Sequence, residues 1–252
     1  MILAIDAGNT QTVLGLFEGK SLRQVWRVPS TSSSLRRWKL SLSKKRTSRP
    51  PMNGKVTAVL ISSVVPSLRE DLLALAQKVS DKKPSFISSR SSLPLRLKLK
   101  KPETVGADRI VNAVGALAQW KKDLLIIDFG TATTFDLVTK KGEFLGGVIV
   151  PGLQTMNRSL ASACSQLPEI SLTPFPKRVV GQNTKEAIRS GIFFGSLGLV
   201  EGMIRKFEKE FGHPLFVVIT GGWAPRLGPY LAEAIHAVDP HLTLKGLQEL
   251  GA

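Results

Sequence analysis

Cysteine and histidine are scarce in this chain of 252 residues, which has one cysteine and three histidines. A single cysteine, Cys164, excludes an internal disulfide and any Cys-x-x-Cys metal site, a pattern typical of a reducing compartment. We expect Cys164 to be a small packing residue. His213, His236 and His241 follow no spacing that suggests a shared metal ion. These absences favour a cytoplasmic protein.

Long apolar runs are also missing. None approaches the roughly 20 residues that a helix needs to cross a bilayer. Met1 leads straight into Ile-Leu-Ala-Ile-Asp, without the basic leader of a signal peptide. We therefore expect no membrane attachment. The 42% hydrophobic content is ample for the core of one large domain or two small ones.

Acidic residues are absent from two stretches of a chain whose net charge is +16. Residues 20–55 contain eleven Lys or Arg, and residues 82–101 contain seven, so the remainder of the chain sums to −2. Pro29 to Asn53 is also rich in Ser and Pro, which predicts a flexible loop. Basic loops of this kind are more often solvated than bound to nucleic acid. Trp26 and Trp38 nevertheless leave a nucleic-acid partner open, because aromatic rings stack on bases.

Apolar runs and turn residues predict alternating strands and helices. Strands are expected at residues 1–7, 13–17, 22–28, 56–62, 124–128, 134–139, 144–150 and 215–219, and helices from about Ser67, over 107–120, from Pro151-Gly152 to about Leu167, and from about Asn183. Ser67 with Glu70, and Asn183 with Glu186, have the spacing of helix N-caps. Four glycines, Gly191, Gly195, Gly198 and Gly202, lie in the helix that begins near Asn183. Each costs about 1 kcal/mol of helix stability relative to alanine, so we expect them to be there for close helix packing.

An internal echo relates the two halves of the chain. Residues 5–12, Ile-Asp-Ala-Gly-Asn-Thr-Gln-Thr, match residues 127–134, Ile-Asp-Phe-Gly-Thr-Ala-Thr-Thr, at an offset of 122. Ile, Asp, Gly and the final Thr recur, and each copy falls where one apolar strand turns back into another. Duplication is the economical explanation.

The two echoed turns have the chemistry of a polyphosphate site. A polyphosphate needs backbone N–H donors at close range and a carboxylate for its magnesium ion. Asp6 with Gly8, and Asp128 with Gly130, meet that description. Taken alone, each is an ordinary hairpin sequence. Together with the turn Thr220-Gly221-Gly222 after a third buried strand, they match the two phosphate turns and the nucleoside turn of actin-like ATPases.

Further motifs make the resemblance specific. In order along the chain they are Asp6-Ala7-Gly8-Asn9-Thr10, Ser62-Ser63-Val64-Val65-Pro66, Gly106-Ala107-Asp108-Arg109, Asp128-Phe129-Gly130-Thr131-Ala132-Thr133, Gly146-Gly147 with Pro151-Gly152, and Gly181-Gln182-Asn183-Thr184. This set resembles the motifs of the type III pantothenate kinase family over nearly the whole chain. Gly-Ala-Asp-Arg at a helix start is the most family-specific of them.

The resemblance implies ATP-dependent phosphorylation of pantothenate to 4'-phosphopantothenate, the first step of coenzyme A biosynthesis. It implies a homodimer that uses ATP with Mg²⁺ and a monovalent cation, K⁺ or NH₄⁺. The implied fold is α/β, with two ribonuclease H-like (actin-like ATPase) halves, residues 1–119 and 120–252, and a nucleotide cleft between them.

The resemblance also implies roles for individual residues. The implied nucleotide-binding residues are Asp6, Ala7, Gly8, Asn9, Thr10, Gln11, Thr12, Val13 and Thr131, and the implied substrate-binding residues are Gly106, Ala107, Asp108, Arg109 and Thr184. Asp108 is the implied catalytic base. Asp6 would place magnesium indirectly, and Asp128 would bind the monovalent cation.

Gly-Ala-Asp-Arg has a chemical rationale without the family. An aspartate at a helix start can accept a proton from an attacking hydroxyl, and the arginine beside it can bind a carboxylate through paired N–H donors. The plainer interpretation is an acid favoured by the helix dipole and a solvated arginine.

Two departures and two alternatives stand beside this interpretation. The family resemblance leads us to expect a tyrosine shortly before Gly-Ala-Asp-Arg, and Leu99 is nearest that position. The mixed-charge helix expected after the third strand is replaced by the basic segment Arg36 to Arg49.

One alternative function is that of a non-catalytic protein that binds nucleic acid through its basic loops. The other is a kinase of the same fold for a different hydroxy acid or sugar.

Overall fold

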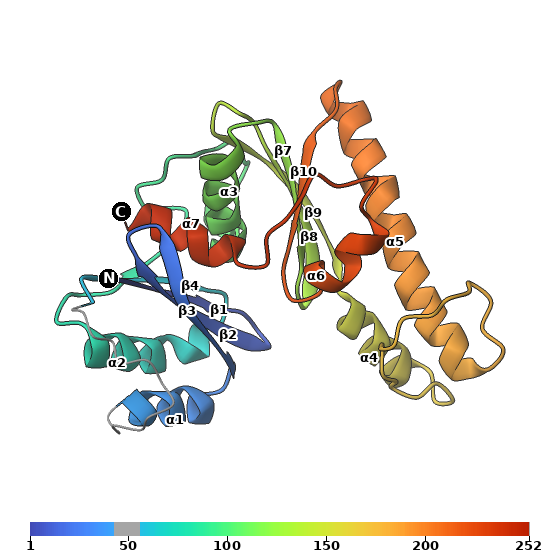
Figure 1. Cartoon of the computed structure of the whole chain (residues 1–252), viewed down its shortest axis with the longest axis horizontal. Helices are drawn as coiled ribbons and strands as arrows, with labels where there is room; N and C mark the ends of the chain where they lie inside the picture. The colour runs from blue at the N-terminus through green and yellow to red at the C-terminus, as the bar shows by residue number, and fades with distance from the viewer. Residues whose placement is uncertain (43–55, 252) are drawn as a thin grey trace. The chain divides into compact units, whose positions relative to one another are not determined.

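The computed structural model describes residues 1–42 and 56–251, which form two compact units (Figure 1). The first unit comprises Met1–Lys121, Lys141–Leu145 and His241–Ala252, and the second comprises Lys122–Lys140 and Gly146–Pro240. The predicted division at residues 119 and 120 differs from this grouping at its C-terminal end. The reason is packing, because Leu244 and Leu247 of the last helix belong to the core of the first unit.

The first unit is built on a sheet of five strands. They are β1 (Ile2–Ala7), β2 (Gln11–Glu18), β3 (Ser21–Pro29), β4 (Ala58–Ser63) and β5 (Ser85–Phe86), arranged β3-β2-β1-β4-β5. The first three strands pair antiparallel, whereas β1 with β4 and β4 with β5 pair parallel. The strands predicted in this region are confirmed.

Helices cover both faces of this first sheet. They are α1 (Ser32–Leu42) and α2 (Arg69–Val79) on one face, and α3 (Ala107–Trp120) and α7 (Leu242–Leu250) on the other (Figure 1). Short 3-10 turns at Pro66–Leu68 and Pro102–Thr104 precede α2 and α3. Alternate residues of β1 point into opposite cores, Leu3 and Ile5 towards α1 and α2, and Ala4 towards α3 and α7.

The second unit repeats the same strand order. Its strands β7 (Leu124–Phe129), β8 (Ala132–Val138), β9 (Glu143–Pro151), β10 (Phe216–Thr220) and β11 (Ala237–Val238) run β9-β8-β7-β10-β11, with β6 (Arg96–Leu97) paired to the start of β9. Here too the first pair, β7 with β8, is antiparallel, while β7 with β10 and β10 with β11 are parallel. The duplication predicted from the echoed turns is confirmed at the level of topology.

One face of the second sheet packs on helices α4 (Leu153–Ala163), α5 (Thr184–Phe211) and α6 (Ala224–Leu227), with a 3-10 turn at Gly228–Tyr230. Phe129, Phe135 and Phe193 are among the largest buried side chains of this core. By length and composition α5 could cross a membrane, which the sequence analysis did not anticipate, and 39% of its most apolar window is buried inside the structure. Core helices of soluble proteins meet the same criteria, so this is weak evidence for a membrane.

The prediction of a flexible loop from Pro29 to Asn53 is wrong for its first part. Residues 32–42 form α1, and residues 43–53 lie outside the described part of the chain. Leu35 and Trp38 of α1 are buried, and the ring of Trp38 packs edge to face on the ring of Trp26, with 5.6 Å between the ring centroids. Arg36 forms an ion pair of 2.9 Å with Asp71 of α2. Contacts with the rest of the unit thus order a segment whose composition alone predicts disorder.

Three smaller predictions from the sequence have different outcomes. Asn183 caps α5 as expected, because its side chain accepts a hydrogen bond of 3.0 Å from the backbone N–H of Glu186. The predicted cap at Ser67 is wrong, since α2 follows a 3-10 turn and its N-cap position is Leu68, without a side-chain hydrogen bond. Cys164 is exposed and therefore is not a packing residue.

Among residues 1–42 and 56–251, nothing outside α5 packs against its glycines. A Cβ atom added at Gly191, Gly195 or Gly198 would have no described heavy-atom neighbour within 4 Å, and at Gly202 only the end of Arg205 lies that near. The predicted close helix packing is therefore wrong for the described part of the chain. The glycines instead form an open strip on the helix surface.

Candidate functional site

The first phosphate turn connects β1 to β2 and is held by hydrogen bonds at both ends. The backbone N–H of Gly8 donates to the carbonyl of Gln11 at 3.1 Å, and the N–H of Val64 donates to the carbonyl of Ala7 at 3.1 Å. The hydroxyl of Ser30 donates to the carbonyl of Gly8 and lies 2.9 Å from the hydroxyl of Thr12. Asn9 and Thr10 remain exposed at the tip. The turn is anchored while its tip stays accessible to a ligand.

Asp6 occupies the last part of β1, and its strand neighbours are set by register. It pairs with Val13 of β2 on one side and with Ser62 of β4 on the other. Since paired residues share a face of the sheet, Asp6, Val13 and Ser62 form one row on the side of α3 and α7. The described residues contain no group of three or more His, Cys, Asp or Glu placed to hold a metal. Asp6 is the carboxylate of this turn, and carboxylate oxygens are the kind of ligand that a magnesium ion prefers.

Gly-Ala-Asp-Arg stands at the start of α3, as predicted. Gly106 is the N-cap residue, and a Cβ there would overlap the Asp108 carboxylate and lie 3.6 Å from Val64. The Asp108 carboxylate accepts the backbone N–H of Arg109 at 2.8 Å. Burial raises the pKa of Asp108 above its ordinary value, although the N–H and the charge of Arg109 oppose the shift. Through Val64, the first phosphate turn and Asp108 belong to one neighbourhood of the first unit.

Arg109 and the expected substrate region lie on the same side of this unit. The Arg109 guanidinium stands over the ring of Phe144 at 5.7 Å. The backbone N–H of Lys98 donates to the carbonyl of Phe144 at 2.9 Å. Leu99, where we expected a tyrosine, follows directly and is half-buried. Arg109 and the segment before α3 thus both contact Phe144, and residue 99 of that segment is an apolar leucine instead of a tyrosine.

The second phosphate turn, between β7 and β8, is braced by the start of α4. The N–H of Gly152 donates to the carbonyl of Thr131 at 3.0 Å, and the Thr155 hydroxyl donates to the same carbonyl at 2.6 Å. A Cβ at Gly152 would overlap the backbone of Gly130 and Thr131. Only glycine fits at position 152, because the backbone of the turn approaches too closely to leave room for a side chain. Thr131 itself stays exposed.

The predicted nucleoside turn packs on the same structure. Gly221 has φ +90°, and a Cβ there would overlap the Asp128 carboxylate and lie 2.7 Å from the backbone of Phe129. Thr220 is the register partner of Asp128. The second unit therefore brings together three motifs that are distant in sequence, at Asp128–Thr131, Pro151-Gly152 and Thr220–Gly222. Thr184 is an exposed residue at the start of α5, on a different segment.

Three residues with a structural part in these turns were not among the predicted site residues. Ser30 anchors the first turn, Ser62 neighbours Asp6, and Gly152 supports the second turn. Ser62 and Gly152 stand within motifs that the sequence analysis quoted, so their position carried a signal. Ser30 had none, because its role depends on a hydrogen bond across the sheet to a residue 22 positions away.

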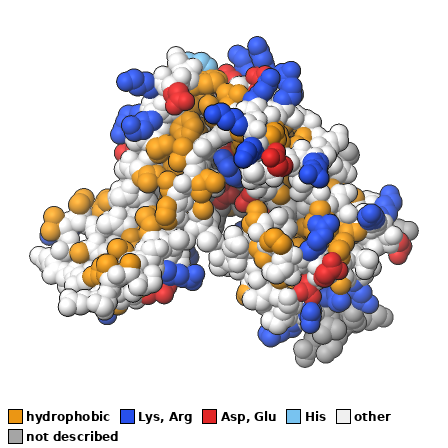
Figure 2. Space-filling model, turned by 180° about the vertical axis from the view of Figure 1, so that it is seen from behind, with side chains coloured by type: hydrophobic (Ala, Val, Ile, Leu, Met, Phe, Trp, Pro, Cys, Tyr) orange, Lys and Arg blue, Asp and Glu red, His pale blue; other side chains and the backbone are white. Residues whose placement is uncertain are grey.

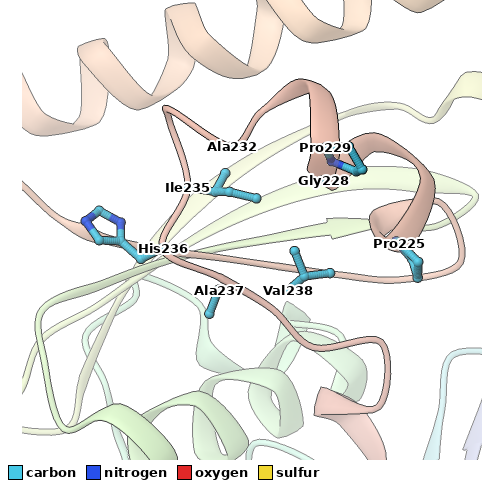
Figure 3. Close-up of a pocket in the computed structure, with 8 residues that line it drawn as sticks. All are labelled: Pro225, Gly228, Pro229, Ala232, Ile235, His236, Ala237 and Val238. Carbon is cyan, nitrogen blue, oxygen red and sulfur yellow. The ribbon is translucent and has the colours of Figure 1, made fainter.

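A pocket of about 450 Å³ lies apart from these motifs (Figure 3). Figure 3 shows its wall formed by the chain from α6 to β11, with lining residues Pro225, Gly228, Pro229, Ala232, Ile235, His236, Ala237 and Val238. The lining is apolar except for His236, whose Nδ1 accepts the backbone N–H of Val217 at 3.0 Å. None of the predicted site residues lines it, so the pocket is not the predicted site.

Solved structures similar to this chain identify its architecture. MreB5 of Spiroplasma citri has a TM-score of 0.52 at 11% identity, covering 98% of this chain and 95% of MreB5. A ROK hexokinase from Thermus thermophilus has a TM-score of 0.51 at 14% identity, covering 99% and 97%. A Baf family transcriptional activator from Campylobacter jejuni has a TM-score of 0.59 at 20% identity, covering 98% and 96%. The chain therefore has the actin-like ATPase fold, the class that its doubled strand order and paired aspartate turns define.

Sequence relatives narrow this class to one family. A family model described as type III pantothenate kinase matches residues 2–206. Type III pantothenate kinases from Anaeromyxobacter dehalogenans and Myxococcus xanthus are 40% and 41% identical to it, over 99% and 98% of this chain and 98% and 96% of their own. The chain belongs to the type III pantothenate kinase family.

Proposed function

We propose that this protein transfers the γ-phosphoryl group of ATP to the hydroxyl of pantothenate, giving 4'-phosphopantothenate, the first step of coenzyme A biosynthesis. One observation within the family assignment carries the proposal. Asp108, with its pKa raised by burial, lies at the start of α3 beside the segment that also contacts the first phosphate turn. A general base and a phosphate-binding turn in one neighbourhood are what phosphoryl transfer to an alcohol requires.

Each aspartate turn would bind phosphate oxygens of the nucleotide. Asn9, Thr10 and Thr131 are exposed at the turn tips and would contact phosphate oxygens, with backbone N–H groups of residues 6–13 supporting them. Asp6 would hold magnesium through its water shell, and Asp128 a monovalent cation, K⁺ or NH₄⁺. Bound magnesium neutralises charge on the phosphates during transfer. The protein's own part is to orient the phosphate chain.

The acceptor would be oriented by the start of α3. Asp108 accepts the proton of the attacking hydroxyl, and Arg109 holds the pantothenate carboxylate through paired N–H donors. Gly106 and Ala107 form the backbone of this site. Because Leu99 offers no hydroxyl, Arg109 would contribute a larger share of substrate binding than it would with a tyrosine beside it.

We further propose that the active form is a homodimer, with Thr184 of one copy reaching the pantothenate of the other. The surface around Thr184 supports this. Val179 and Val180, just before it, are 67% and 79% exposed. The open glycine strip of α5 continues that surface and would admit a second helix at close range. Glycines cost helix stability, and close packing against another copy would offset that cost.

The nucleic-acid alternative has less support than the sequence suggested. Trp38 is buried in the core of the first unit and cannot stack on a base without unfolding of α1. On the face shown in Figure 2, Lys and Arg side chains are scattered among other residues and form no continuous patch. The basic character therefore favours a solvated surface.

A coupled ADP-release assay with ATP, magnesium, potassium and pantothenate tests the proposal. Turnover should depend on pantothenate, should not be supported by glucose or N-acetylmannosamine, and should fall when sodium replaces potassium. A preference for a sugar would contradict the substrate assignment. Equal turnover in sodium and potassium would contradict the cation site.

Sedimentation of Gly195→Glu against Gly212→Asn tests the dimer. Gly195 lies on the open strip, and Gly212 is the left-handed C-cap of the same helix, a conformation that asparagine also adopts. A charge at Gly195 should yield an inactive monomer, whereas the control substitution should keep the dimer. A wild-type monomer with full activity would contradict this proposal.

A further inference from the structure

Ser62 has a buried hydroxyl that the fold does not use. The residue is 0% exposed, and its Oγ has no hydrogen-bond partner among the described residues. Buried polar atoms are almost always paired, because removal from water without a replacement partner is unfavourable. A position in a well-packed strand that keeps such an atom requires an explanation.

The neighbouring serine shows what a structural hydroxyl looks like in this segment. Ser63 accepts the backbone N–H of Val65 at 3.2 Å through its Oγ, and so helps to shape the turn after β4. Successive strand residues point to opposite faces. Ser63 therefore lies on the side of α1 and α2, and Ser62 on the side of α3 and α7, with Leu60.

The unpaired hydroxyl stands beside the proposed magnesium carboxylate. Ser62 is the direct register partner of Asp6 across the parallel β1–β4 pair. Adjacent strands are about 4.8 Å apart, so the two side chains are close neighbours on one face. Two residues further on, Val64 contacts both the first phosphate turn and Gly106. Ser62 is thus flanked by the nucleotide turn and by the start of α3.

The second half of the chain repeats the register but not the unpaired hydroxyl. Thr220 is the register partner of Asp128, at the end of the strand equivalent to β4, and is 1% exposed. Both halves therefore place a buried hydroxyl residue directly beside the aspartate of a phosphate turn. At Ser62 packing alone does not require the hydroxyl, because alanine would remove only a group that has no hydrogen-bond partner among the described residues.

We propose that Ser62 is a nucleotide-binding residue, whose hydroxyl forms its missing hydrogen bond with an oxygen that arrives with magnesium-bound ATP or ADP. The proposal rests on the proposed function, because it takes Asp6 as the residue that holds the hydrated cation. Ser62 would supply a second, uncharged group to the same oxygen shell, on the side that faces α3. Burying the unpaired Ser62 hydroxyl is unfavourable in the nucleotide-free protein, and the hydrogen bond to the bound nucleotide would offset that cost.

Calorimetric titration of ADP, with and without magnesium and in the absence of pantothenate, tests the assignment. The variants are Ser62→Ala, Ser62→Thr, which keeps the hydroxyl, and Ser63→Ala as the matched neighbour. Ser62→Ala should weaken magnesium-dependent ADP binding about tenfold, the range expected for one hydrogen bond to a charged assembly. Ser62→Thr should lose less than half as much binding free energy as Ser62→Ala does. Binding of ADP without magnesium should be unchanged.

Thermal unfolding of the nucleotide-free variants provides a second readout. Ser62→Ala removes an unpaired buried hydroxyl and should melt at or above the wild-type temperature, whereas Ser63→Ala should melt below it because a turn contact is lost. A destabilised Ser62→Ala, or one that binds magnesium-ADP like the wild type, would overturn the proposal. A shifted pH profile of kcat with intact magnesium-ADP affinity would place the hydroxyl on Asp108 and overturn it as well.

Because these measurements use ADP alone, their outcome is separate from the choice of substrate. The pantothenate assay can fail while Ser62 behaves as expected. The reverse result, an active pantothenate kinase whose Ser62→Ala variant is unaffected, would refute only the role of Ser62.

Discussion

The two halves of this chain share a strand order and an aspartate at the same register, yet they hold their phosphate turns by different means. In the first unit the turn is tied by hydroxyls, with Ser30 and Thr12 bonded across the sheet. Gly8 has open space around it, since an added Cβ would meet only the Gln11 carbonyl, at 3.4 Å. In the second unit Gly152 and Gly221 press backbone against backbone.

Duplicated turns can therefore differ in how well they tolerate substitution. A hydroxyl tie can be lost or replaced by water at modest cost, whereas a close backbone approach admits no side chain at all. The first half also contains the start of α3 with Asp108, and the second contains the exposed face of α5. In the proposed function, the half with the hydroxyl-tied turn also contains the acceptor site at the start of α3, whereas the second half contributes a turn braced by close backbone contacts.

The largest expected effect concerns Asp108, the proposed base, which lies in the first half. Asp108→Asn should lower kcat by about 10² to 10⁴ while leaving the affinity for ADP nearly unchanged, because a general base acts in the transition state. Steady-state kinetics and ADP titration would measure both. Arg109→Ala is the matched neighbour and should chiefly raise KM for pantothenate. Wild-type kcat in Asp108→Asn would reduce the motif to a helix start.

The pH dependence of Asp108 follows from its burial. Because burial raises its pKa, the folded protein keeps this proton to a higher pH than the unfolded chain does. From the ordinary aspartate pKa of about 3.9 upward to the raised folded value, the folded state binds more protons, so stability falls as pH rises through this window. Asp108→Asn should lack this fall and melt at or above the wild-type temperature at pH 7. A base with a raised pKa becomes protonated, and kcat falls, at a pH above the ordinary aspartate range. If kcat of the wild type declined only below pH 4, the raised pKa of Asp108 would be contradicted.

The next effect contrasts the two turns directly. Gly221→Ala should destabilise the protein by about 2–5 kcal/mol, since it combines a left-handed φ with overlap onto Asp128 and Phe129. Gly8→Ala should cost less than about 1 kcal/mol, because its surroundings are open. Denaturant unfolding of the two variants measures the difference. Similar losses of unfolding free energy at both positions would contradict the proposed difference in tolerance between the two turns.

A smaller effect separates the two helix starts that looked alike in sequence. Asn183→Ala removes a formed cap from α5 and should cost about 1 kcal/mol of unfolding free energy. Ser67→Ala removes a hydroxyl that caps nothing in α2 and should change stability by less than about 0.5 kcal/mol. Urea midpoints of the two variants would show whether only the second half depends on its cap.

The smallest expected effect concerns the ordered basic helix of the first half. Hydrogen bonds from Ser32 and Arg36 lower the pKa of Asp71. Arg36→Ala should nevertheless cost only about 0.2–1 kcal/mol, because the Arg36 side chain is 70% exposed, and the cost should shrink at high salt. Leu35→Ala should cost about 2–5 kcal/mol, since burial of apolar side chains holds α1. A larger loss from Arg36→Ala than from Leu35→Ala would show that charge orders the helix.

Several features could be predicted from the sequence alone because they depend on neighbours along the chain. Apolar runs specified the strands, and the helical periodicity of residues 107–120 specified α3 at the bounds found in the structure. The echo of Asp-x-Gly at a fixed offset predicted the duplication, since each turn is a local strand–turn–strand unit. The candidate residues of the first turn and of the start of α3 followed from the same local motifs.

Other features depend on contacts between distant segments, so they become visible only in the folded structure. α1 exists because Leu35 and Trp38 find a core built from β1, β3 and α2, which no local pattern in a Ser- and Arg-rich segment reveals. The demand for glycine at positions 152 and 221 arises from a backbone more than twenty residues away. Ser62 became distinct from Ser63 only when the register placed it beside Asp6 and left its hydroxyl without a partner, because pairing across a sheet is a property of the assembled fold.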